Sequence, residues 1–196
     1  MKHFLKILVL TAVVSCAPLA QAVPVAFYAS LNGANEFPGN LSPGTGNAFV
    51  VFDTALHTMS VHVDFNGLLA GTTAAHIHCC TAVANTGTAG VATTTPTFTG
   101  FPGGVTGGTY DHLFDMSLAS SYNAAFFNAH GGNTAQAEAD FFAGMFSEKT
   151  YLNVHTTAFP GGEIRGFLHL APEPGSMALL GLGLAGLGFC RRKRAG

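Results

Sequence analysis

Apolar and polar residues alternate along several short stretches of the chain, with the period of two that marks half-buried β-strands. The clearest stretch is 59–65, where Met, Val, Val and Phe alternate with Ser, His and Asp. Short apolar segments bounded by turn-forming residues predict six further strands, at 25–31, 47–53, 72–78, 109–117, 151–156 and 163–170. Turns are expected at 53–57 and 160–162. About seven strands predict an all-β, immunoglobulin-like Greek-key sandwich.

A short helical insertion interrupts the strands. Residues 120–130 and 134–146 are expected to form two helices separated by a Gly-Gly pair, with Asn133 or Thr134 as the N-cap of the second helix. The second helix has an apolar face that we expect to pack in the core, formed by Ala137, Phe141, Phe142 and Met145. Residues 82–108 are rich in Thr, Gly and Pro, and a loop this long in a compact domain is functional or mobile.

The composition supports a domain with an apolar core and a weakly charged surface. Hydrophobic residues make up 48% of the chain and charged residues only 9%. Between residues 23 and 171, two basic side chains stand against nine acidic ones, which gives a formal charge of −7. A domain this acidic lacks the basic surface that binds phosphate backbones, so the sequence excludes nucleic acid as a partner.

The N-terminus predicts a secretory signal peptide. Two lysines precede an apolar run at 7–14, and an Ala-Gln-Ala cleavage pattern ends at Ala22. A membrane anchor at this end is one alternative. Another is lipidation at Cys16, because the four residues that end there resemble a lipoprotein processing box. The Ala-Gln-Ala pattern lies at a suitable distance from the apolar run, so cleavage after Ala22 is favoured.

The C-terminus predicts a sorting tail with a transmembrane segment. Pro172, Glu173 and Pro174 precede an almost wholly apolar run at 175–190, slightly shorter than the ~20 residues of a relaxed membrane span. A basic cluster follows, which favours a cytoplasmic end. Together these features resemble the PEP-CTERM sorting signal. The resemblance implies a Gram-negative, exopolysaccharide-producing bacterium and an exosortase that cuts the tail, whereas a permanent single-span anchor is the alternative.

Several short motifs are spread along the chain between these two ends. They are LNGANE at 31–36, GNA at 46–48, AHIH at 75–78, YLNVHT at 151–156 and FPGGEIRG at 159–166. These motifs resemble the CHRD domain, named after chordin, a family that is also found in bacterial exported proteins. The expected organisation is therefore a signal peptide at 1–22, a CHRD-like β-sandwich at 23–171 and a PEP-CTERM tail at 172–196.

Three histidines are candidates for a metal site. His76 and His78 share one face of a predicted strand, His155 lies on another strand, and Cys80 shares the first face if that strand continues. Such a set holds zinc or copper. An H-x-H strand also distantly resembles the copper–zinc superoxide dismutases, although no further ligands for two metals are visible. The alternative is that these histidines hydrogen-bond backbone groups and stabilise loops, and this is favoured because histidine spacing alone is permissive.

Two further pairs of residues stay open. Cys79 and Cys80 are the cysteines left between the two ends. Their Cα atoms would lie ~3.8 Å apart across a trans peptide, so a bridge between them would be strained. Intermolecular pairing and a metal or redox role are the alternatives to a vicinal bridge. Glu163 and Arg165 share a predicted strand face, where a structural salt bridge or hydrogen-bond clamp is favoured over a functional pair.

No catalytic residue can be assigned, because no nucleophile beside a base and no close carboxylate pair can be placed. The sequence therefore predicts an exported, envelope-sorted, non-enzymatic component of the cell surface or of the exopolysaccharide matrix. Its expected partners are exosortase, the secretion machinery and exopolysaccharide or surface proteins, with membrane contact through the tail before processing. The alternative is a module that binds zinc or copper, with redox activity, through His76, His78 and His155.

Overall fold

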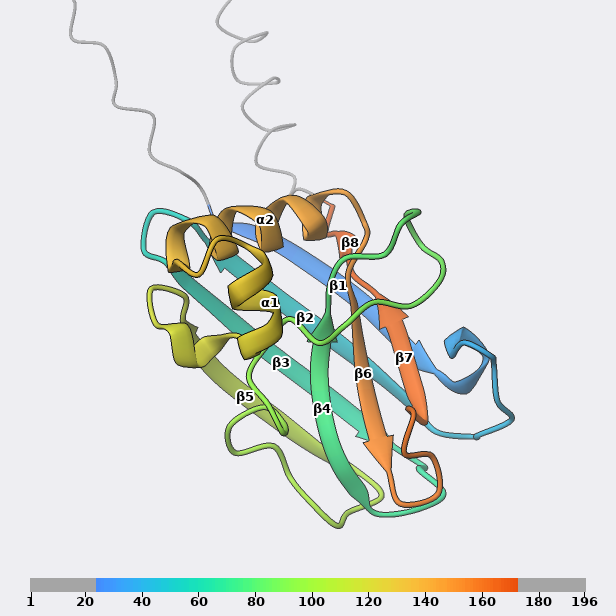
Figure 1. Cartoon of the computed structure of the whole chain (residues 1–196). Helices are drawn as coiled ribbons and strands as arrows, with labels where there is room; N and C mark the ends of the chain where they lie inside the picture. The colour runs from blue at the N-terminus through green and yellow to red at the C-terminus, as the bar shows by residue number, and fades with distance from the viewer. Residues whose placement is uncertain (1–23, 173–196) are drawn as a thin grey trace, which may run out of the picture.

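The computed structural model describes residues 24–172, which form a curled antiparallel β-sheet with short helices across one end (Figure 1). The strands of this region are β1 (Val25–Asn32), β2 (Thr45–Asp53), β3 (Thr58–Asn66), β4 (Thr72–His78), β5 (Gly108–Asp115), β6 (Tyr151–Thr156), β7 (Ile164–Phe167) and β8 (His169–Leu170). Its helices are η1 (Gly33–Asn35), η2 (Ala119–Ser121), α1 (Ala124–Ala129) and α2 (Thr134–Phe146). The predicted all-β class is confirmed.

The strands pair in the order β4-β6-β7-β1-β2-β3-β5, and β8 pairs with β1. The arm formed by β4, β6 and β7 lies in front of the arm formed by β1, β2, β3 and β5 in Figure 1. The arms are joined where Asn32 of β1 pairs with Arg165 of β7, so the pairing runs through one continuous sheet. The finer prediction of a Greek-key sandwich, immunoglobulin-like or superoxide dismutase-like, stays a prediction.

The alternating pattern of the strands builds the core, because side chains two residues apart share one face of a strand. The apolar side chains of both arms meet between them, where they are almost completely excluded from solvent. They include Phe27, Leu31, Val50, Phe52, Met59, Val61 and Val63 on one arm and Ala75, Ile77, Leu152, Val154 and Ile164 on the other. The opposite face of the β4-β6-β7 arm carries the polar side chains of these strands together with the rings of Tyr151 and Phe167.

The helices close one end of the core (Figure 1). The predicted apolar face of α2 packs inward as expected: Phe141 is fully buried, and the ring of Phe142 lies 5.3 Å from that of Phe52. Asn133 caps α2 by accepting a hydrogen bond from the backbone of Gln136. The other helix is shorter than predicted, because Asn123 is extended and caps α1 with its side chain.

The long loop that follows β4 lies against the edge of that strand and is hydrogen-bonded to it. The backbone N–H groups of Ala75 and Ile77 donate to the hydroxyls of Thr97 and Thr93, both at 3.0 Å. The carbonyl oxygen of Ile77 accepts a bond from the N–H of Ala92 at 2.9 Å. The loop therefore supplies to β4 the hydrogen bonds that a neighbouring strand would supply.

No helix within residues 24–172 is long and apolar enough to cross a membrane. Pro172, the first residue of the predicted sorting motif, is the last described residue. The remaining features of the two ends lie outside the described residues: the signal peptide with Ala22, the alternative lipidation site Cys16, Glu173 and Pro174 of the sorting motif, and the apolar run at 175–190.

Candidate metal centre

Three histidines meet on the polar face of the β4-β6-β7 arm. His76 and His78 share this face of β4, and His155 shares it on β6, which pairs with β4. One ring nitrogen from each histidine lies within 4.8 Å of the corresponding nitrogens of the other two. The structure therefore brings together the three histidines that the sequence analysis selected.

Each of the three rings is fixed by a backbone carbonyl oxygen of a neighbouring loop. A carbonyl only accepts hydrogen bonds, so the ring nitrogen that contacts it carries the hydrogen. The bonds run from His76 Nε2 to Pro96 O at 2.7 Å, from His78 Nδ1 to Ala89 O at 2.9 Å, and from His155 Nδ1 to Pro160 O at 2.9 Å. In a neutral imidazole the second ring nitrogen then presents a lone pair.

The second nitrogens are His76 Nδ1, His78 Nε2 and His155 Nε2, and all three are buried. None of them has a hydrogen-bond partner among residues 24–172. A buried polar atom without a partner costs about 1–3 kcal/mol, and most such atoms in folded proteins are paired. Three lone pairs close to one another are the donor set that a transition-metal ion requires, so the residues present fit a metal.

The surroundings keep these imidazoles uncharged. Burial lowers the pKa of His78 to about 4, and burial also lowers the pKa values of His76 and His155. A positive neighbour adds to the effect at His78, because Arg165 disfavours a second positive charge there. Neutral imidazole is the form that binds metal, so protons do not compete for these nitrogens at pH 7.

Arg165 lies on the same face and ties two loops to it. Its guanidinium donates to the carbonyl oxygens of Asn35 and, at 3.1 Å, of Gly87. It also lies over the ring of Tyr151, which in turn stacks on His78 with 4.6 Å between ring centroids. Arg165 therefore holds two loops and the Tyr151 ring next to the histidine group without being one of its ligands.

Glu163 does not pair with Arg165, although the two were expected to share a strand face. Glu163 is fully buried and precedes β7, so the alternation of the strand does not extend to it. Its carboxylate accepts hydrogen bonds at 2.6 Å from the Ser42 hydroxyl, the Leu69 N–H and the Thr156 hydroxyl. Glu163 thus holds three separate segments of the chain together by hydrogen bonds, without the contact to Arg165 that the sequence suggested.

Two residues near the centre were not singled out by the sequence. Asn153 lies opposite His76 in the pairing of β4 with β6, and its amide donates to Glu36 at 3.4 Å. The Glu36 carboxylate also lies 3.9 Å from the guanidinium of Arg165. Asn153 could have been identified from the sequence, because it lies two residues before His155 and so shares its face of the predicted strand. Glu36 ends the LNGANE motif, but its place beside Arg165 depends on how the fold brings distant segments together.

Glu36 makes the stability depend on pH. Burial raises its pKa from 4.5 to about 7, although the positive charge of Arg165 lowers it in part. The folded protein therefore holds this proton at pH values where the unfolded chain has released it. The contribution of Glu36 to stability is complete below pH 4.5 and is lost as the pH rises through 7.

We therefore compare the change in unfolding free energy that Glu36→Gln causes at pH 8 with the change that it causes at pH 4. The change is expected to be more stabilising at pH 8, by on the order of 3 kcal/mol. Denaturant unfolding of both proteins at the two pH values measures this difference. Glu148→Gln, which removes a more exposed carboxyl, is the control and should give no such gain at pH 8. An effect of Glu36→Gln that is equal at both pH values would contradict the assignment.

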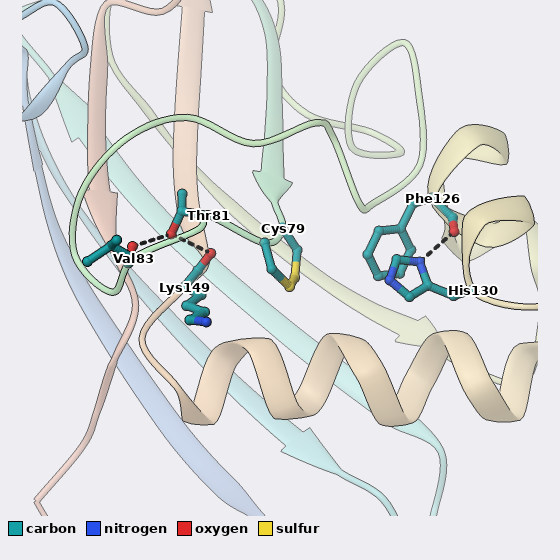
Figure 2. The surroundings of a disulfide bond; sticks show 7 residues. Cys79, Thr81, Val83, Phe126, His130 and Lys149 are labelled. Atoms are coloured by element: carbon teal, nitrogen blue, oxygen red, sulfur yellow. Dashed lines mark hydrogen bonds between the residues drawn. A yellow bond between two sulfur atoms is a disulfide. The ribbon is translucent and has the colours of Figure 1, made fainter.

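The two cysteines occupy a separate position. Cys79 and Cys80 are joined by a vicinal disulfide directly after His78, which is one of the arrangements that the sequence left open. Figure 2 shows this bridge between the end of β4 and α2. The Cys80 sulfur is therefore not part of the group formed by His76, His78 and His155.

Comparison with known proteins identifies two regions. A model of the CHRD domain matches residues 27–168, and a model of the PEP-CTERM protein-sorting motif matches residues 170–194. No curated protein and no solved structure matches the chain. The two matches confirm both resemblances that the sequence motifs indicated.

Proposed function

This chain belongs to the CHRD domain family and carries a PEP-CTERM sorting motif, and from that premise we propose that its exported domain binds a zinc or copper ion through His76, His78 and His155. The sorting motif marks the chain for export, for exosortase processing and for sorting to the bacterial envelope. The observation that supports the metal is the group of three buried, uncharged nitrogens without partners within residues 24–172.

The chemistry of the donors selects the class of metal. Imidazole nitrogen suits zinc and copper, whereas calcium and magnesium require oxygen ligands. A hydrogen bond from the other ring nitrogen to a carbonyl oxygen is the usual way in which proteins orient a metal-binding histidine. All three rings have such a bond. Three protein ligands also leave one position of a tetrahedral ion for water or another molecule.

The second candidate is a cell-surface or exopolysaccharide-matrix component that binds no metal. In this case the histidines only hold the loops that carry Ala89, Pro96 and Pro160. Those hydrogen bonds support the structural role equally well, but they leave the second ring nitrogens unexplained. Three further proposals are compatible with either candidate. They are binding of exopolysaccharide or surface proteins, removal of the signal peptide after Ala22, and a membrane helix at 175–190.

Metal loading of the exported form, made without metal-binding tags, tests the choice. We expect one zinc or copper ion per chain after dialysis and a rise in melting temperature that a chelator reverses. Binding should persist at pH 6 and be lost towards pH 4, because the histidine pKa values lie below their ordinary value of 6.5. Protein that stays metal-free, with a melting temperature unchanged by zinc, copper and chelator, would support the second candidate.

A further inference from the structure

We propose that the disulfide between Cys79 and Cys80 is a thiol-exchange site that reacts with low-molecular-weight thiols. The bridge lies at the end of β4, apart from the polar face that carries the three histidines. A cavity between α1 and the loop after β4 leads to it. The proposal concerns a second site and does not depend on whether a metal binds to the histidines.

The first argument is that this disulfide cannot stabilise the fold as an ordinary cross-link between distant residues does. Disulfides stabilise proteins mainly because they close a loop and so restrict the unfolded chain, and the effect grows with the length of that loop. Cys79 and Cys80 are neighbours in the chain, so their bridge closes no loop. A chemical role therefore accounts for the bridge better than a contribution to stability.

The second argument is that α2 leaves space for the two sulfur atoms at a glycine. Gly144 of α2 lies directly against them, as the position of the bridge above α2 in Figure 2 illustrates. A Cβ atom on Gly144 would lie 2.6 Å from the Cys79 sulfur and would also overlap the Cys80 sulfur. Any residue larger than glycine would displace the bridge, so α2 covers one side of it closely.

The third argument is that another side of the bridge is accessible. The cavity has a volume of about 320 Å³, and its lining includes Cys79, Val91, Phe126, Ala129 and His130. Cys80 is itself exposed to solvent. Cys79 itself is only 7% exposed, so a small thiol would reach the bridge in the folded protein either through this cavity or from the exposed side at Cys80.

His130 lines the same cavity as Cys79. Its ring packs on Phe126 with 4.0 Å between centroids, and its Nδ1 donates to the Phe126 carbonyl oxygen at 2.7 Å. In a neutral imidazole the Nε2 atom then presents a lone pair.

The exchange follows the usual two steps. The thiolate of a first thiol attacks the Cys79 sulfur, the bond to the Cys80 sulfur breaks, and Cys80 leaves as a thiolate that takes a proton. A second thiolate attacks the external sulfur of this mixed disulfide and releases the Cys79 thiolate. In sum, two external thiols are oxidised to one disulfide, and the protein disulfide is reduced to two thiols.

The test is reduction of the full-length protein by dithiothreitol without denaturant, followed by alkylation and mass analysis of the peptide that contains residues 79 and 80. We expect both cysteines to become alkylated in folded protein. Ala129→Phe places a large side chain in the cavity and should slow the reaction about tenfold or more, because exchange depends on access to the sulfur. Ala124→Phe, on the exposed surface of α1 but outside the cavity, should react like the wild type.

A second measurement uses the wild-type protein alone and so does not depend on how the variants fold. A protein dithiol such as reduced thioredoxin is too large for the cavity and should react about tenfold more slowly than dithiothreitol at equal thiolate concentration. A bridge that is reduced only in denaturant would overturn the proposal. So would an Ala129→Phe protein that folds and reacts at the wild-type rate. Metal content, measured on the same samples, reports on the histidine site independently.

Discussion

Replacing His78 by alanine is expected to abolish metal binding and to leave the domain folded. The substitution removes one of three ligands, and even the outer partners of metal ligands are worth about 10- to 100-fold in affinity. We therefore expect a loss of more than about 100-fold. The core between the two arms does not include this side chain, which lies on the opposite face of β4 from Ile77.

Competition with a coloured chelator measures the affinity, and far-ultraviolet circular dichroism reports the fold. His155→Ala should behave in the same way, because its ring completes the group from β6. His62→Ala is the matched control, since that histidine pairs with Asp111 outside the group. If the histidines are purely structural, His78→Ala will cost about 0.5–1.5 kcal/mol through the lost hydrogen bond to the Ala89 carbonyl, which keeps the Tyr151 hydroxyl as a donor. The protein will then show no metal affinity to lose.

Replacing Glu163 by alanine is expected to cost about 3–5 kcal/mol of folding free energy, because three buried donors lose their partner at about 1–3 kcal/mol each. Glu163 is fully buried and accepts three short hydrogen bonds from three separate segments of the chain. Alanine would leave the donors at Ser42, Leu69 and Thr156 without their partner. A loss of this size is a large fraction of the 5–15 kcal/mol that stabilises an ordinary domain.

Denaturant unfolding gives the loss directly, provided that the variant still folds. Glu163→Gln keeps the shape of the side chain and one acceptor oxygen, so it should cost less than alanine. Asp111→Ala removes an exposed carboxylate and should change the stability by less than about 0.5 kcal/mol. A Glu163→Ala protein as stable as the Asp111→Ala protein would show that the clamp contributes nothing.

The histidine group could be predicted in part because strand alternation is a local property. The i and i+2 spacing places His76 and His78 on one face whatever the rest of the chain does. The pairing of β4 with β6, which brings in His155, joins segments more than 70 positions apart and cannot be read from spacing. The YLNVHT and AHIH motifs supplied that connection only through the family resemblance.

The failures occurred where a strand ends. Alternation beyond His78 would have placed Cys80 beside the histidines, but β4 stops at His78 and the two sulfurs bond to each other. Glu163 likewise lies just before β7 begins, so it does not follow the alternation that places Arg165. A rule based on period two holds inside an element, whereas strand ends are set by contacts with distant segments.

The loop after β4 also affects how copies of the protein meet. A strand at the edge of a sheet offers unpaired backbone groups that another chain can extend into a shared sheet, which is a common start of aggregation. Here Thr93 and Thr97 occupy those groups on β4, so that edge cannot accept a strand from a second molecule. Within residues 24–172, pairing of a second chain along an edge would therefore be expected at β5, the other end of the strand order, or beside the two-residue β8.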